Sequence, residues 1–140
     1  DSAEKFAESY AKCQREHWGG AECVVRWEIL ARALKIALQK GFIKSDDFYE
    51  EDEFLIEKLE QSGNEEITMA LKILGKPKLE LTENREKPQF NLKKKFRYID
   101  PHYLKDGRTH ILSEASNDYF YFLEDQRRNN GRGIKVDIRV

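Results

Sequence analysis

The chain has 140 residues, of which 39% are hydrophobic and 36% charged, and its mean hydropathy is -0.79. This length is enough for one ordinary domain or two small lobes with a buried core. No apolar run approaches the roughly 20 residues that cross a bilayer, so no membrane partner is expected. The two cysteines, Cys13 and Cys23, are too few for a disulfide framework, and we expect reduced thiols in a cytoplasmic protein.

The formal net charge of -1 conceals a difference between the two halves of the sequence. Residues 1–75 carry 16 acidic and 10 basic side chains, which gives a net charge of -6. Residues 76–140 carry 10 acidic and 15 basic side chains, which gives +5. An anionic partner would therefore bind the second half, although neither value is high enough to require nucleic acid.

Helical spacing of apolar residues dominates the first half. An apolar stripe over residues 3–17 is followed by two glycines, and a long helix is predicted over residues 21–40. A further helix is predicted over residues 45–62, and Asn64 should cap a last one. The long helix is expected to bury a seam made of Val24, Trp27, Ala31, Leu34 and Leu38, which is widened by Leu30, Ala33 and Ala37.

The second half changes to a spacing of two. Alternating apolar and polar residues predict strands over residues 79–81, 90–98 and 134–140. Between the last two strands, Ser113 has the position expected of the cap of a helix that passes through Tyr119.

These elements predict an α+β fold, with an N-terminal antiparallel helical bundle followed by a small antiparallel sheet and one covering helix. The helical region should occupy residues 1–76 and the small α+β lobe residues 77–140. We expect the two to form one compact unit that is the C-terminal part of a longer protein.

The most site-like feature is a row of cations in the predicted strand 90–98. Lys93, Lys95 and Arg97 fall on one face, because successive side chains of a strand point to opposite sides. If the last strand lies beside this one, Lys135 and Arg139 extend the cationic face. These five residues are therefore candidates for phosphate binding, since arginine offers a bidentate fork and lysine a compact charge. The alternative is a solvated sheet face whose charges serve solubility and protect the edge.

Catalytic and metal-binding patterns are missing from the sequence. The three histidines, His17, His102 and His110, are scattered, and neither cysteine belongs to a pair with metal-ligand spacing. A glycine-rich phosphate loop and a Gly-x-Ser-x-Gly elbow are absent as well. We therefore assign no catalytic residue and no metal ligand.

Several short blocks resemble one known family. They are the helix 24–40, the Leu-Ile-Glu-Lys-Leu of residues 55–59, the Lys-Phe-Arg-Tyr-Ile-Asp-Pro of 95–101, the Leu-Ser-Glu of 112–114 and the Gly-Ile-Lys-Val of 133–136. Together they resemble the C-terminal portion of HD-domain metal-dependent phosphohydrolases of the deoxynucleoside triphosphate triphosphohydrolase kind.

The resemblance implies roles for a few residues. Lys95 and Arg97 would either contact a nucleotide phosphate or serve as structural charges. Asp100 and Pro101 would set the following turn, and Ser113 would cap the helix. The family is named for a His…His-Asp…Asp metal set in its N-terminal portion, and this sequence has no His-Asp dipeptide. No cofactor is therefore expected in this chain, and the divalent metal would belong to a missing N-terminal portion.

The leading hypothesis is an accessory C-terminal region of an HD-type nucleotide phosphohydrolase, which completes a substrate or effector pocket or a subunit contact without catalysing the reaction. Its partners would be a nucleotide or phosphate ligand and further copies of the chain. The alternative is a non-enzymatic protein-interaction module whose basic face is incidental. A nucleic-acid-binding domain is less favoured, because Phe96 and Tyr98 alternate with the cations and so face the opposite side.

Overall fold

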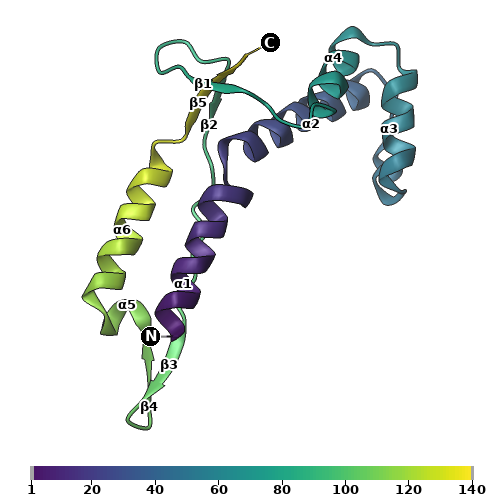
Figure 1. Cartoon of the computed structure of the whole chain (residues 1–140). Coiled ribbons are helices and arrows are strands. Elements are labelled where there is room, and N and C mark those ends of the chain that lie inside the picture. Colours follow the sequence, from purple (N-terminus) through teal and green to yellow (C-terminus); the bar gives the residue numbers. More distant parts are fainter. Residues whose placement is uncertain (1, 140) are drawn as a thin grey trace. The chain divides into compact units, whose positions relative to one another are not determined.

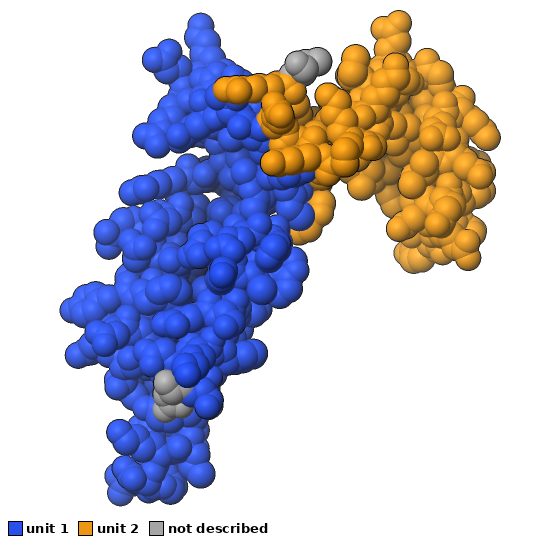
Figure 2. Space-filling model, viewed as in Figure 1, with its two compact units in different colours: residues 1–24, 81–137 blue, residues 25–80, 138–140 orange. Residues whose placement is uncertain are grey.

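The computed structural model describes residues 2–139, which form two compact units (Figure 2). Unit 1 consists of the described residues up to 24 together with 81–137, and unit 2 consists of 25–80 together with the described residues from 138 onward. The longer segment of unit 2 ends at Glu80, and residues 2–24 belong to unit 1.

Unit 1 begins with helix α1 (Ser2–Cys13), which continues as a π-helical turn, η1 (Gln14–Trp18). The carbonyl of Gln14 accepts a hydrogen bond from Gly19 N at 2.7 Å, and a Cβ atom on Gly19 would lie 2.7 Å from the same oxygen. The turn therefore closes on a residue without a side chain, as the sequence predicts for the end of the first helix.

Unit 2 contains most of α2 (Ala21–Gln39), then the 3-10 turn η2 (Ser45–Tyr49) and helices α3 (Asp52–Gln61) and α4 (Glu65–Leu74). Asn64 caps α4 as predicted, since its side-chain oxygen accepts from Glu66 N at 3.1 Å and Ile67 N at 3.2 Å. The core of this unit is a cluster of Ala37, Ile43, Leu59 and Ile67.

Two details of the helical prediction are wrong. The predicted helix 45–62 is broken, because Glu50 and Glu51 have extended backbone between η2 and α3. In α2 the buried positions are Val25, Ile29, Ala33 and Ala37, whereas Trp27 is 59% exposed and Ala31 and Leu38 are also exposed. Small alanines at Ala33 and Ala37 allow neighbouring segments close approach on that face, and this packing decides which side of the helix is buried.

The strands form two antiparallel sheets, which together with the helices give the α+β class that the sequence predicts (Figure 1). Strands β1 (Leu81–Glu83), β5 (Ile134–Ile138) and β2 (Phe90–Leu92) make a sheet in the order β1-β5-β2. Val140, which the prediction included in the last strand, lies outside the described residues.

The second sheet is a hairpin of β3 (His102–Lys105) and β4 (Arg108–Ile111). Its turn consists of Asp106 and Gly107, both with positive φ, at 51° and 72°. Helices α5 (Leu112–Ala115) and α6 (Asn117–Gly131) follow. Within unit 1, α6 lies beside α1, and Ala7, Leu112, Tyr119 and Leu123 form the buried cluster between them (Figure 1).

The predicted strand over residues 90–98 is correct only for its first three residues. Strand β2 pairs with β5 through Phe90↔Val136, Asn91↔Lys135 and Leu92↔Ile134. The next position opposite is Gly133, where the chain turns from α6 into β5 with φ of 68°. Residues 93–98 therefore have no strand to pair with at this edge. They run along α6 instead, without strand hydrogen bonding.

No helix within residues 2–139 combines the length and the apolar character needed to cross a membrane.

Gly133 offers a direct test of this corner. A Cβ atom there would lie 2.7 Å from Leu92 O, and the positive φ is unfavourable for any residue with a side chain. We expect Gly133→Ala to lower the free energy of unfolding by about 1–3 kcal/mol in urea titrations.

The matched control is Gly131→Ala, because Gly131 ends α6 with open space around its Cβ position. This change should leave the free energy of unfolding within about 1 kcal/mol of the unsubstituted protein, since alanine is favoured over glycine in a helix. Equal effects of the two substitutions would contradict the tight corner.

Candidate functional site

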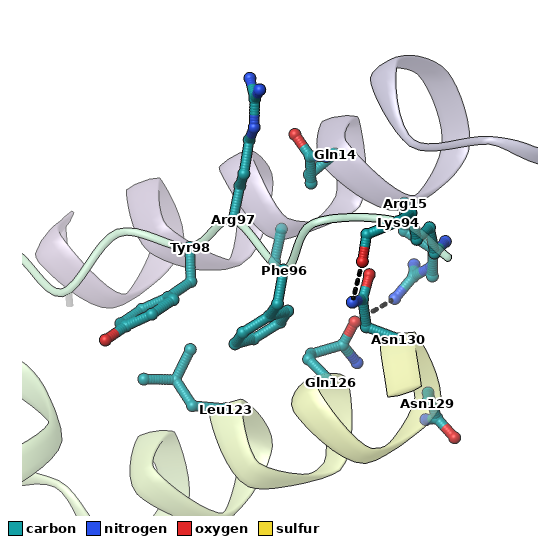
Figure 3. Close-up of a pocket in the computed structure, with 11 residues that line it drawn as sticks. Gln14, Arg15, Lys94, Phe96, Arg97, Tyr98, Leu123, Gln126, Asn129 and Asn130 are labelled. Carbon is teal, nitrogen blue, oxygen red and sulfur yellow. Dashed lines mark hydrogen bonds between the residues drawn. The ribbon is translucent and has the colours of Figure 1, made fainter. Parts of the chain in front are cut away.

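The segment after β2 is held against the ends of two helices. Asn130 of α6 donates its side-chain amide to Lys94 O at 3.0 Å (Figure 3). The Lys94 ammonium donates to Gly19 O at 2.9 Å, just after η1. Further along, the buried Tyr119 hydroxyl donates to Ile99 O at 2.5 Å. These bonds replace the strand pairing that residues 93–99 lack.

Asp100 and Pro101 lie at the end of this segment, where they organise the start of α5. Asp100 Oδ1 accepts from Ser113 N at 3.0 Å, and its other oxygen accepts from the Ser113 hydroxyl. Pro101 O accepts from Leu112 N at 3.1 Å. The sequence predicts Ser113 as the cap of the long helix, and this prediction is wrong. That cap is Ser116, whose hydroxyl accepts from Tyr119 N at 3.2 Å.

A small hollow lies between this segment and helices α1 and α6, with a cavity volume of about 90 Å³. Figure 3 shows Phe96, Tyr98 and Leu123 turned toward one another, whereas Arg97 points away from them. The Arg127 guanidinium lies over the Phe96 and Tyr98 rings, at 5.0 and 5.5 Å from their centroids. The small hollow is lined by Ala11, Gln14, Arg15, Lys94, Phe96, Arg97, Tyr98, Leu123, Gln126, Asn129 and Asn130.

Lys94 lines this hollow, and the sequence prediction did not include it. It is half-buried, and its burial lowers the pKa of its ammonium below the ordinary value. A signal was available, because Lys94 has the same parity as Leu92 and Phe96 and so falls on the inner side of the segment. The alternation itself survives without a strand, since Lys93, Lys95 and Arg97 are all exposed.

A second, wider depression adjoins the small hollow and shares Arg15 and Asn129 with it. We call it the basic groove. Its volume is about 850 Å³, and its lining is Arg15, Glu83, Arg85, Asn129, Arg132, Gly133 and Lys135.

The charges of the basic groove are not balanced by its carboxylates. Glu83 is paired with Arg85 at 2.7 Å, and Arg15 is paired with Glu16 at 3.0 Å. Among residues 2–139, the Arg132 and Lys135 side chains have no hydrogen-bond or ion-pair partner. Two exposed cations therefore remain uncompensated in a concave surface, where they attract an anion more effectively than on a convex one.

The five predicted phosphate-binding residues are not brought together on one face. Lys135 lines the basic groove and Arg97 lines the small hollow. Lys93 and Lys95 are exposed and line neither, and Arg139 belongs to unit 2. The prediction also missed Arg15 and Arg132. Arg15 is 120 positions from Lys135 in the sequence, so only the folded chain shows that they line one groove.

No group of three or more His, Cys, Asp or Glu side chains within residues 2–139 is arranged to hold a metal ion. Cys13 and Cys23 are free thiols in the structure. The chemistry available in both hollows is therefore recognition by cations and side-chain amides.

No family and no solved structure matches the chain. One curated protein is similar, the uncharacterized protein YdhJ of Bacillus subtilis (strain 168), with 32% identity over 138 residues. The similar region covers 99% of this chain, which spans only 42% of the length of that relative.

Tyr119 gives a test of how the segment is held. Burial, together with the negative charges of Asp100 and Glu8, raises the pKa of its hydroxyl to about 12. In the unfolded chain the tyrosine pKa is about 10, so the protonated hydroxyl contributes its full stabilisation of the fold below about pH 10. This stabilisation is lost as the pH rises through about 12, the pKa in the folded chain. We expect the unsubstituted protein to be more stable than Tyr119→Phe at pH 8, by about 1 kcal/mol. The difference should shrink or reverse by pH 11.5.

Urea unfolding at both pH values measures this difference. Tyr121→Phe serves as the control, since Tyr121 is exposed and its substitution should change little at either pH. A constant difference for Tyr119→Phe from pH 8 to 11.5 would contradict a hydroxyl that must stay protonated.

Proposed function

We propose that this chain is an accessory, non-catalytic region of an HD-type nucleotide phosphohydrolase that acts in the cytoplasm. Its role is to provide positive surface for the phosphates of a nucleotide substrate or effector. The observation that carries this proposal is the basic groove, where Arg132 and Lys135 lack partners among residues 2–139 and Arg15 lies in the same lining.

The family resemblance of residues 95–101 supports the nucleotide as ligand, because phosphohydrolases of that kind act on nucleotides. The length of the similar bacterial protein also supports the proposal, since this chain spans 42% of it and the remainder has room for a catalytic portion. In this proposal the divalent metal and its His…His-Asp…Asp ligands belong to that other portion.

Thermal unfolding with nucleotides tests the proposal. A ligand that binds only the folded chain raises the midpoint, and at about 100 times its Kd it adds about 2.7 kcal/mol. For a chain of this size we expect deoxynucleoside or ribonucleoside triphosphates to raise the midpoint by roughly 5–10 °C. The rise should occur without divalent metal, because the proposed contacts are made by side chains.

The matched control is the corresponding nucleoside, which has the same base and sugar and no phosphate. An equal rise with nucleoside and nucleotide would assign binding to the base. No rise with any triphosphate at millimolar concentration would remove phosphate binding from the function of this chain.

A second candidate function is a protein-interaction module that forms homo-oligomers. It is favoured by the exposed apolar side of α2, where Trp27 is 59% exposed and Leu30 and Leu38 are each 38% exposed. Apolar side chains gathered on one helix face commonly mark an interface. The proposed occupant is the same face of a second copy, because closed homo-oligomers commonly pair identical surfaces.

Sedimentation over a range of protein concentrations tests this candidate. We expect a dimer whose dissociation constant rises at least about tenfold in Trp27→Gln/Leu38→Gln, because burying apolar area is the main attraction. Leu104→Gln is the control, since Leu104 is 74% exposed in the β3-β4 hairpin. A chain that stays monomeric throughout, or a dimer weakened equally by the control, would contradict this candidate.

A further inference from the structure

The basic groove collects its cations from three separate parts of unit 1. Arg15 comes from η1, at the end of the first helix, Arg132 follows α6 directly, and Lys135 lies in β5. Between the last two is Gly133, whose Cβ position lies 2.7 Å from Leu92 O. This tight corner fixes the backbone on both sides of it, so that Arg132 and Lys135 project from a rigid base.

The orientation of Lys135 follows from its strand. Its neighbours Ile134 and Val136 are buried, so alternation places the Lys135 side chain on the exposed side of the sheet. Its cross-strand partner is Asn91, an exposed residue without charge. The Lys135 ammonium is therefore exposed to solvent on a paired strand. Because this backbone is already ordered, little free energy of binding is spent on ordering it.

The electrostatics favour a ligand with several negative charges. The lining carboxylate Glu83 pairs with Arg85, and Arg15 of the lining pairs with Glu16. Arg132 and Lys135 have none among the described residues, 2–139. Asn129 adds a neutral lining residue that the groove shares with the small hollow. A ligand that met only one cation would leave the others repelling each other.

The dimensions separate a single phosphate from a chain of phosphates. The basic groove, at about 850 Å³, is open and much larger than one phosphate, whereas the adjoining small hollow has about 90 Å³. Arg15 and Asn129 line both, and Lys94 lies beyond them in the small hollow. The cations thus continue from one depression into the next, which suits a ligand whose phosphates are linked.

From these features we infer that the basic groove binds an oligophosphate, such as the triphosphate of a nucleotide, through Arg15, Arg132 and Lys135. This inference rests on the proposed function, because it names the part of the ligand and the residues that bind it. It moves the site away from Lys93 and Lys95, which are the cations that the sequence alone favoured.

Calorimetric titration with sodium tripolyphosphate, orthophosphate and a nucleoside triphosphate tests the inference, at an ionic strength of about 0.1 M. The test variant is Arg132→Gln/Lys135→Gln. The control is Lys93→Gln/Lys95→Gln, which removes the same net charge from exposed residues that line neither depression. All four side chains are exposed, so neither variant should lower the thermal midpoint below that of the unsubstituted protein, and this is measured first.

We expect tripolyphosphate to bind at least about tenfold more tightly than orthophosphate, because linked phosphates reach several cations. The groove variant should weaken tripolyphosphate binding at least about tenfold, and the control variant less than about threefold. Equal weakening in both variants would show attraction by net charge alone and would overturn the inference.

The remaining outcomes separate the inference from the proposed function. If the nucleoside triphosphate binds the groove variant as tightly as the unsubstituted protein, the inference fails. The chain then still binds a nucleotide, as the proposed function requires, but at a site other than the basic groove. If neither tripolyphosphate nor any nucleoside triphosphate binds the unsubstituted protein, both fail together.

Discussion

The close approach of Gly133 to the carbonyl of Leu92 is the constraint on which the rest of unit 1 depends. It brings the end of α6 against the end of β2 and thereby sets the register in which β5 pairs. Because the chain is already turning at Gly133, β2 can gain no further pairs beyond Leu92. The same corner therefore ends the sheet, sends residues 93–99 along the helices and presents Arg132 and Lys135 to the basic groove.

Once the segment leaves the sheet, its backbone groups and Lys94 must find other partners. The Lys94 carbonyl accepts from Asn130, its ammonium donates to Gly19 O, and Ile99 O accepts from Tyr119. Burial of a lysine disfavours its charged form, and the single carbonyl contact offsets only part of that penalty. Lys94 thus ties the segment to the end of η1, and its burial lowers the pKa of its ammonium.

The sequence predicts the features that arise from local chemistry. Asn64 before two glutamates gives a helix cap, and the alternation in β5 gives the buried Ile134 and Val136, because each depends on near neighbours. Local chemistry could not show that the strand ends at Leu92. The strand ends there because the position opposite the next residue is Gly133, where the chain turns out of α6. The buried side of α2 is predicted only in part. The pattern includes Ala33 and Ala37 but centres the seam on Trp27, because alanines carry little hydrophobic signal.

The site shows the same division between local and tertiary information. Lys135 was predicted on an exposed strand face and is found on one, but its cationic neighbours in the groove come from η1 and the end of α6. The row of cations in the sequence favours Lys93 and Lys95, whose side chains line neither the small hollow nor the basic groove. The row of cations therefore indicates the region of the groove but not the residues that line it. The spacing of side chains along one segment does not show which helix ends lie beside that segment.

Uncompensated cations in a concave surface have a thermodynamic consequence for the whole unit. Arg132 and Lys135 repel each other and Arg15 in the folded chain, and they separate when it unfolds. An anion bound among them removes that repulsion and adds its own attraction, so binding and folding are linked. Salt also screens the repulsion between these cations, because the Debye length is about 10 Å at an ionic strength of 0.1 M. In the inferred complex, an oligophosphate would differ from salt because it would also bridge η1, the end of α6 and β5. Such binding would stabilise the corner at Gly133 and the run of residues 93–99 that follows β2.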